Sequence, residues 1–434
     1  MGEDEHVAVP EQDTDVDVAS IPGARGSPDT NAGMHVYFVG NEFGFPIGNA
    51  STNKLGLEAR CLVEEGFRVS VLLLAPVERP ESACNTRTRG SWYGADFEYT
   101  CGATIRSASF LVRRWRRFRG FTVAAWRLFG PGCIPRNRRC VILFSTGGAV
   151  ALGIQLLCRL CGVANAIDVC EWVPDLSSPP GLAVWSYRSG FTFRLANGII
   201  AISRFLEERV CERDARAGRK MLRLATLIDQ EEFIGVRPVC EVGPYVLWAG
   251  LLPAYLDSVL FLIRALAELG AEHSMCRLMI AGAVPELSRR RLVEEAIACG
   301  VDPSRLLFPG YVSRKELLAL YRGARGLLLP LDASDRSKAR LPFKLGEYLS
   351  AGRPVISSDV GDIGLYLQHM HNVLFSPPGD AAAFGRSIAY VLTHRDEADR
   401  IGASGREAVG QCFAYGSHRQ RIAEFVRKLV LRSI

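Results

Sequence analysis

Short apolar runs alternate with helix-length amphipathic segments in two successive rounds, and this alternation restricts the fold more than any other feature of the chain. The first round predicts strands at His35–Gly40, Val69–Leu74, Val141–Phe144, Ala164–Asp168 and Gly198–Ile202, and helices at Thr52–Glu65, Ala149–Cys161 and Arg204–Arg213. Such alternation is typical of parallel sheets joined by right-handed crossovers. The first half of the chain is therefore predicted to be an α/β domain.

The alternation pauses at Glu231–Pro244, which contains two prolines and two glycines, and then restarts. The second round predicts strands at Tyr245–Ala249, Arg277–Ala281, Leu306–Phe308, Gly326–Leu329, Pro354–Ser357 and Asn372–Phe375. The helices predicted between them are Leu256–Leu269, Pro285–Ala298, Ser313–Arg322 and Pro342–Ala351. Ser313 and Glu316 have the spacing of a capping box at the start of the third helix. A second α/β domain is predicted.

A chain of 434 residues exceeds what one compact core usually holds, which agrees with two domains. We assign 34–230 to an N-terminal domain, 231–244 to a linker and 245–410 to a C-terminal domain. The amphipathic segment 411–434 is expected to form a helix that packs back on the first domain. Residues 1–33 carry eight acids and one arginine, and they are predicted to be a disordered acidic tail.

Thirteen cysteines without framework spacing favour reduced thiols in a cytoplasmic protein. Cys158 and Cys161 form a CxxC pair without a second pair, so no metal site is expected. The acidic start does not resemble a signal peptide. The uncharged stretch Cys140–Cys158 contains glycines and polar residues, and it is interpreted as a strand, a turn and a helix rather than a membrane span.

A glycine-rich segment follows the first predicted strand, from Gly40 through Gly44 to Gly48 and Asn49. Glycines let a backbone approach a ligand closely, and ligands of parallel sheets lie at the carboxyl ends of strands. The alternative is a plain strand-to-helix turn.

The strongest local pattern lies in Asp332–Asp362, where a polar loop with Arg336, Lys338 and Arg340 leads into a predicted helix. Cations before a helix N-terminus are suited to a diphosphate. Lys344 and Glu347 are three residues apart and share one helix face. A carboxylate one turn into the helix can accept hydrogen bonds from two adjacent hydroxyls, as on a ribose. The alternative is a solvated charged loop with a surface ion pair.

This block, Lys-x-x-Glu-Tyr-Leu-x-x-Gly-Arg-Pro-Val from Lys344 onward, resembles the donor-binding half of family 4 glycosyltransferases. The N-terminal Phe-Pro-x-Gly ending at Gly48 is similar to the glycine loop of one subgroup. The resemblance implies the GT-B fold, an α/β architecture of two Rossmann-like domains facing across a cleft. It further implies a retaining, hexosyltransferase-like activity without a metal or other cofactor. The donor would be a nucleotide sugar, with UDP or GDP favoured, and the acceptor a hydroxyl on a glycan or lipid-linked molecule.

Carried over by position, the resemblance assigns Glu347 to the ribose and the helix start to the diphosphate. The implied donor-binding residues are Gly48, Asn49, Gly250, Gly282, Lys338, Pro342, Phe343, Lys344 and Glu347. Lys344 and Arg340 would neutralise the leaving group. Glu171, in the loop after the strand predicted at Ala164–Asp168, would position the acceptor hydroxyl; its alternative is a helix cap or an ordinary loop charge.

The sequence departs from the family at four places. One is Ser145–Gly147, after the strand predicted at Val141–Phe144, where the family often has a histidine. Leu251 and Leu256 stand where the family usually has an arginine and a lysine that neutralise the diphosphate, and Ala339 replaces the first of two carboxylates. Either the loop cations take over, or the protein is a catalytically silent GT-B module that binds a nucleotide or a partner. A UDP-sugar epimerase, which shares the fold, is a third interpretation.

Arg106–Arg139 contains ten arginines and no acid, with six Trp and Phe residues between them. This mixture is typical of segments that bind an anionic membrane surface, which would make the protein peripheral on a membrane. A polyanionic ligand, or a basic helix packed through its aromatic side, are the alternatives. No motif indicates specific nucleic-acid binding.

Overall fold

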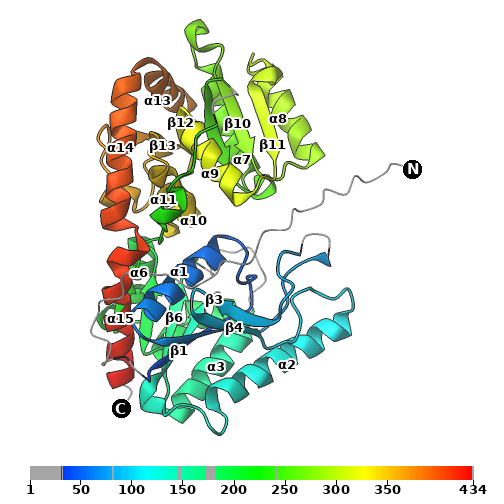
Figure 1. Ribbon diagram of the computed structural model, residues 1–434, viewed down its shortest axis with the longest axis vertical. Coiled ribbons are helices and arrows are strands. Elements are labelled where there is room, and N and C mark those ends of the chain that lie inside the picture. Colours follow the sequence, from blue (N-terminus) through cyan, green and yellow to red (C-terminus); the bar gives the residue numbers. More distant parts are fainter. Residues whose placement is uncertain are drawn as a thin grey trace. The chain divides into compact units, whose positions relative to one another are not determined.

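The computed structural model describes residues 31, 33–80, 83–144, 148–172, 181–239 and 243–432. The chain divides into two compact units (Figure 1). The first comprises the described parts of Met1–Asp168, Ser178–Ile199 and Arg419–Ile434, and the second those of Val169–Ser177 and Ile200–His418. Residues 200–230, which we assigned to the first domain, thus group with the second unit. Most of the predicted acidic tail lies outside the described residues, but the buried side chain of Asn31 donates to the carbonyl of Glu65 at 2.7 Å.

The first sheet has eight strands in the order β3-β4-β2-β1-β5-β6-β7-β8. Their bounds are β1 His35–Gly40, β2 Arg68–Leu73, β3 Arg89–Trp92, β4 Ala95–Tyr99, β5 Arg139–Phe144, β6 Ala164–Val169, β7 Gly198–Ala201 and β8 Met221–Arg223. β1 lies between β2 and β5 and is parallel to both. β3 is antiparallel to β4. β1 and β5 are buried along their whole length, as expected for a parallel sheet covered on both faces.

The helices of the first unit are α1 Ala50–Glu64, α2 Phe110–Phe129, α3 Gly148–Cys161, α4 Leu182–Arg188 and α5 Phe191–Leu195, together with most of α15 Tyr415–Arg432. α15 lies against β7, because a Cβ on Gly198 would lie 2.6 Å from a methyl carbon of Leu429. Arg419 of α15 also pairs with Glu64 of α1 at 2.8 Å. The end of the chain is therefore fixed to the first unit by apolar and ionic contacts.

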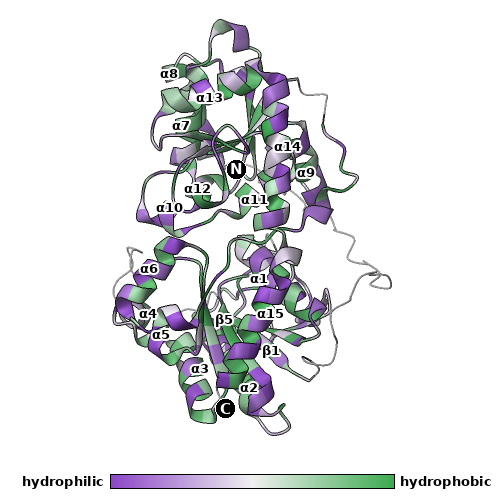
Figure 2. Cartoon of the chain, turned by 90° about the vertical axis from the view of Figure 1, so that its left-hand side faces the viewer, coloured by the Kyte–Doolittle hydropathy of each residue, from purple (hydrophilic) through white to green (hydrophobic). Residues whose placement is uncertain are grey.

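The second sheet has the order β11-β10-β9-β12-β13-β14, and its neighbouring strands are all parallel. Its strands are β9 Tyr245–Ala249, β10 Arg277–Ala281, β11 Leu306–Gly310, β12 Gly326–Leu329, β13 Val355–Ser358 and β14 Leu374–Ser376. The helices are α6 Arg204–Arg213, α7 Leu256–Ala267, α8 Glu286–Ala298, α9 Arg314–Gly323, α10 Asp335–Ala339, α11 Phe343–Ser350, α12 Ile363–Tyr366, α13 Ala381–Thr393 and α14 Arg395–Cys412. In both units the strands are largely hydrophobic while helices such as α15 carry both hydrophobic and hydrophilic residues (Figure 2).

The alternation of apolar runs and amphipathic segments predicted the main strands and helices well. β1, β9, β10, β12 and α6 have the predicted bounds. The capping box at the start of α9 is present, with both of its hydrogen bonds. The β3–β4 hairpin was missed, because its two-residue turn relies on positive φ angles at Tyr93 and Gly94 rather than on an apolar pattern.

The uncharged stretch Cys140–Cys158 was correctly interpreted, since it forms most of β5 and then α3. Within the described residues, no helix is both long and apolar enough to cross a membrane. The predicted linker 231–244 includes part of a short 3₁₀ turn, Gln230–Phe233. It is tied to α9, because Arg322 donates to the carbonyl of Val236 at 2.7 Å.

A buried ionic network joins α1 to the carboxyl end of β6. Lys54 donates to Glu58 at 2.5 Å and also to Asp168, and all three residues are at most 5% exposed. Burial raises the pKa of Glu58, and the neighbouring Asp168 adds to this effect while Lys54 opposes it. Two carboxylates at this depth are stable as a pair only while a cation lies between them.

Replacing Lys54 by methionine should therefore lower the free energy of unfolding by about 3–5 kcal/mol, the range for leaving buried charges uncompensated. Lys428→Met is the matched control, because Lys428 and Glu424 form the same i, i+4 pair on an exposed face of α15. The control should cost less than about 0.5 kcal/mol. Urea denaturation measures both values, and equal losses would contradict the structural role of Lys54.

Candidate functional site

The order of the second sheet defines where a ligand can bind. β9 connects outward to β10 and β11 on one side, and the chain then returns to β12 on the other side of β9. In open parallel sheets, such a switch point opens a crevice at the carboxyl ends of the two central strands. β9 ends at Ala249 and β12 at Leu329, so the candidate site lies at these two positions.

Two glycines border this crevice. The amide of Gly250 donates to the carbonyl of Ala281 at 2.9 Å, and Gly282 follows Ala281 with a φ of +132°. A Cβ on Gly282 would overlap the carbonyl oxygen of Gly250, and a Cβ on Gly250 would lie 2.6 Å from Nζ of Lys344. Glycine is needed at both predicted donor positions because no space remains for a side chain.

α11 brings Lys344 to the end of β9. The hydroxyl of Tyr348 accepts a hydrogen bond from the amide of Ala249 at 2.9 Å, which fixes the helix beside the strand. One turn earlier, Nζ of Lys344 donates to the carbonyl of Ala249 at 2.5 Å. The ammonium lies 4.4 Å from the ring centroid of Trp248 and 5.1 Å from that of Tyr255. Aromatic faces stabilise a cation without neutralising it, so Lys344 keeps its charge for an anion.

Lys344 is also poised to titrate in the physiological range. Burial lowers its pKa to about 8, and the charge of Glu347 opposes that shift. Pro342, the residue before α11, offers no side-chain acceptor to the first amides of the helix. The amides that begin at Phe343 and the ammonium of Lys344 therefore form a positive end at the crevice.

Glu347 lies one turn further along α11, but its carboxylate already has partners. One oxygen pairs with Arg314, and the other accepts from the hydroxyl of Tyr321 at 3.4 Å. Arg314 also pairs with Glu232 at 2.5 Å. Burial alone would lower the pKa of Arg314, but Glu347 and Glu232 outweigh it and raise the pKa. Each carboxylate oxygen retains a lone pair for a ligand hydroxyl.

The loop cations are less available than the sequence suggests. Arg340 pairs with Glu171 at 2.5 Å, so the structure brings two of the predicted catalytic residues together. Lys338 lies 3.5 Å from Asp335, within α10. Leu251, in the position of the family's usual arginine, is 66% exposed and supplies no charge. Lys344 is therefore the cation placed most directly at the end of β9.

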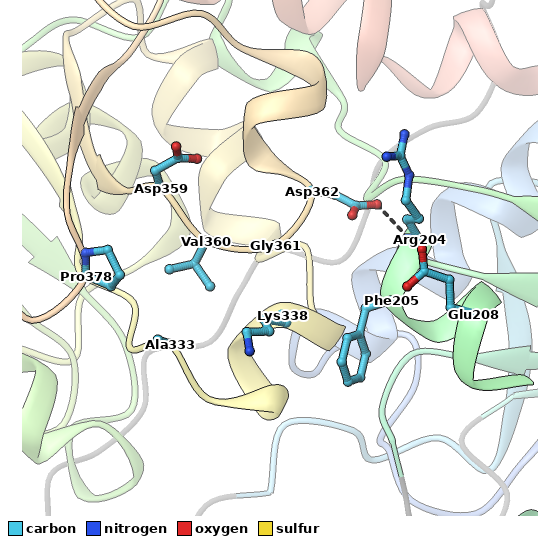
Figure 3. Close-up of a pocket in the computed structure, with 10 residues that line it drawn as sticks. All are labelled: Arg204, Phe205, Glu208, Ala333, Lys338, Asp359, Val360, Gly361, Asp362 and Pro378. Atoms are coloured by element: carbon cyan, nitrogen blue, oxygen red, sulfur yellow. Dashed lines mark hydrogen bonds between the residues drawn. The ribbon is translucent and has the colours of Figure 1, made fainter. Parts of the chain in front are cut away.

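A separate cavity of about 280 Å³ lies near the ends of β13 and β14. It is lined by Arg204, Phe205, Glu208, Ala333, Lys338, Asp359, Val360, Gly361, Asp362 and Pro378 (Figure 3). Asp362 accepts a hydrogen bond from the amide of Arg204 at 2.6 Å, which joins this turn to α6. Among the predicted donor residues, Lys338 alone lines this cavity. Its mixed charges do not select one class of ligand.

Local contacts explain the residue types of the glycine-rich loop that precedes α1. Asn49 caps α1 by accepting from the amide of Ser51 at 3.0 Å. The hydroxyl of Thr52 donates to the carbonyl of Gly44 at 2.7 Å, and a Cβ on Gly48 would overlap that hydroxyl. These contacts explain the residue types at Gly48 and Asn49 as a strand-to-helix turn. Their role toward a donor stays a prediction. Ser145–Gly147, at the end of β5, lie outside the described residues.

Sequence reasoning missed four residues of the crevice: Trp248, Tyr255, Arg314 and Tyr321. Trp248 belongs to an apolar strand and looks like a core residue. Arg314 follows a helix cap, where a surface charge is common. The sequence offered no signal for them, because the burial of Glu347, which is 5% exposed and therefore needs partners, is known only from the structure.

Residues 243–394 match the family model described as glycosyl transferases group 1. A search of curated protein sequences found no match. Among solved structures, sucrose-phosphate synthase from Thermosynechococcus elongatus is similar with a TM-score of 0.67 at 15% identity, over 92% of this chain and 100% of that chain. A glycosyltransferase from Rickettsia africae has a TM-score of 0.64 at 13% identity, over 92% and 98%.

Anabaena HepE, solved in complex with UDP, has a TM-score of 0.60 at 12% identity and covers 92% of this chain and 100% of its own. These likenesses confirm the predicted fold class, GT-B. They extend over both units, whereas the family model covers only residues 243–394, within the second unit.

The low pKa of Lys344 predicts how nucleotide affinity depends on pH. A bound diphosphate would raise that pKa, so binding above about pH 8 must take up a proton and should weaken by up to about tenfold per pH unit. Below that pH the lysine is charged in both states, and the affinity should stay level. Calorimetry with UDP-glucose between about pH 7 and pH 9 measures this.

The Lys344→Met variant should bind UDP-glucose weakly, and its affinity should not depend on pH in this range. Lys315→Met is the control, because Lys315 is an exposed lysine on α9 and its loss should leave the profile unchanged. The same decline in Lys344→Met and in the unmodified protein would mean that another group titrates.

Proposed function

We propose that this protein is a glycosyltransferase that takes a sugar from a nucleoside-diphosphate donor held at the carboxyl edge of the second sheet. The observation that carries the proposal is the ammonium of Lys344, held at the end of β9 by one carbonyl and two aromatic rings. The match of 243–394 to group 1 glycosyl transferases supports it, as does the UDP bound to a protein of the same fold.

The donor would lie with its diphosphate on Lys344 and the first amides of α11, and with its ribose hydroxyls on Glu347. Gly250 and Gly282 would let the nucleotide approach the strand ends. As the glycosidic bond to the donor breaks, negative charge grows on the diphosphate, and a preorganised ammonium stabilises it. Arg340 and Lys338 would contribute once the donor competes with Glu171 and Asp335 for them.

The finer assignments complete the proposal. UDP or GDP is the expected nucleotide, and the acceptor is a hydroxyl on a glycan or lipid-linked molecule, as in polysaccharide synthesis. Glu171 would position that hydroxyl. The anomeric configuration would be retained and no metal required, as the resemblance implies. A screen of UDP- and GDP-sugars by thermal shift is the first test, because a ligand that binds the folded state raises its stability.

A silent binding module is the second candidate. The exposed Leu251 and the ion pairs of Arg340 and Lys338 favour it, since they leave Lys344 as the main charge at the crevice. Incubation with a bound nucleotide sugar and a panel of hydroxyl acceptors separates the two. Release of nucleoside diphosphate supports the transferase, whereas binding without release under every condition supports the silent module.

Glu347→Gln should weaken UDP binding by about 1.5–3 kcal/mol, the range for a hydrogen bond to a charged group. Glu232→Gln is the matched control, because it removes the other carboxylate of Arg314 outside α11. If the two variants lose equal affinity, the effect comes from Arg314 rather than from a ribose contact. Calorimetry on folded protein, verified by circular dichroism, gives both values.

Lys344→Met and Arg340→Met should each lower turnover by more than they lower the affinity for the free nucleoside. The physical reason is that both cations act on the diphosphate, whose charge grows in the transition state. Coupled detection of released UDP gives turnover, and uridine titration gives the nucleoside affinity. Full turnover in both variants would contradict the idea that these cations replace the family's usual pair.

A further inference from the structure

The aromatic face of α2 points to solvent. Leu111, Trp115, Phe118 and Trp126 are spaced so that they share one face of the helix. Their side chains are 76%, 61%, 61% and 62% exposed. An ordinary surface helix buries its large apolar residues and exposes its polar ones, so α2 has the opposite arrangement.

Small residues form the buried face of α2, and they explain this arrangement. Gly120, Ala124 and Leu128 are its buried residues. A Cβ on Gly120 would overlap the carbonyl of Leu74, and the hydroxyl of Thr100 donates to the carbonyl of Gly120 at 2.9 Å. The helix backbone lies so close to the sheet that no aromatic side chain fits between them. The helix therefore packs on the sheet through this face of small residues and not through the exposed stripe.

α2 carries six arginines and no acid. Arg114 and Arg119 border the exposed stripe at helical spacing, and Arg117 is also exposed. Arg127 pairs with Glu98 at 3.0 Å. Across the described residues, no carboxylate forms an ion pair with the other five, which are Arg113, Arg114, Arg116, Arg117 and Arg119. Arg113, Arg116 and Arg119 donate to backbone carbonyls, which orient their guanidinium groups but leave the charge in place. The surface is thus both apolar and strongly positive.

α3 extends the apolar surface. Gly153 of α3 packs on the ring of Phe121 of α2, and Leu156 and Leu160 follow it at i+3 and i+7. They lie on the side of α3 that faces α2 and are 43% and 82% exposed. Figure 1 shows the two helices adjacent in the first unit. An apolar ridge on two neighbouring helices is larger than isolated surface residues would make.

We propose that α2 and the adjoining face of α3 dock on an anionic lipid bilayer, with the axis of α2 parallel to the surface. Trp and Phe side chains partition into the headgroup boundary, and arginines pair with lipid phosphates while their stems lie along the apolar surface. Charge complementarity selects lipid over an apolar protein groove, which would have to bury five arginines without counter-charges. This docking surface is independent of the proposed transferase activity.

Co-sedimentation of the full chain with vesicles tests the proposal. Vesicles of phosphatidylglycerol and phosphatidylcholine in equal parts should bind the protein, and vesicles of phosphatidylcholine alone should bind it far less. Added salt should weaken binding to the anionic vesicles, because surface charges are screened over a Debye length of about 8–10 Å at moderate ionic strength. Equal binding to both vesicles, or no binding to either, overturns the proposal.

Two double substitutions, one on α2 and one on α8, test whether α2 is the surface that binds the vesicles. Arg114→Glu with Arg117→Glu should weaken partitioning by about 30-fold or more, since each basic residue at an anionic surface contributes roughly a fivefold gain. Arg290→Glu with Arg291→Glu makes the same change in net charge on α8 of the other unit and should have little effect. An equal loss in both double variants would mean that net charge alone drives binding and would overturn the assignment to α2.

Trp115→Ser with Phe118→Ser should reduce binding even at high salt, where the electrostatic part is screened. Trp185→Ser, at a half-exposed tryptophan of α4, is the control for loss of an aromatic residue. Gel filtration with and without the double substitution completes the test. A dimer of the unmodified protein that the double substitution dissociates would identify a second copy as the occupant of the stripe and would overturn the membrane proposal.

Discussion

All neighbouring strands of the second sheet are parallel, and this constraint determines where the candidate site lies. Parallel strands need crossovers, and the crossovers return every strand in the same direction, so all carboxyl ends lie along one edge. Because β9 and β12 are neighbours whose connections leave on opposite sides, that edge opens between them. Gly250, Gly282 and the start of α11 meet there without any of them being near in sequence.

Several charged side chains at this edge form ion pairs with one another. Glu347, Arg314 and Glu232 form a chain in which each carboxylate lies against the same guanidinium, while Arg340 is joined to Glu171. Lys344 differs because rings and a carbonyl, rather than a carboxylate, surround it. Burial takes water away from the ammonium and so disfavours its charged form, which lowers the pKa of Lys344 to about 8. The same property suits it to receive an anionic ligand.

The second unit buries its large apolar side chains in a core, whereas α2 of the first unit exposes several of them. The core of the second unit is conventional, with strands β9, β10, β12 and β13 packed against α7, α8 and α13. In the first unit, α2 uses its small residues for packing and leaves its aromatic residues outside. Both arrangements satisfy close packing, but the second leaves apolar area in water, and burying that area against a partner would be favourable.

Local sequence patterns were enough to predict the two rounds of strands and helices, the cap of α9 and the position of the cationic helix start, because periodicity, capping and glycine placement act over a few residues. The β3–β4 hairpin depended on a turn with positive φ angles, which no apolar pattern announces. Only the tertiary structure decided that Arg314 and Tyr321 share Glu347, that Glu171 neutralises Arg340, and that the aromatic side of α2 faces outward. Each of these depends on which distant segments meet and how closely, and Gly120 against Leu74 shows that a clearance of one methyl group is enough to choose the buried face.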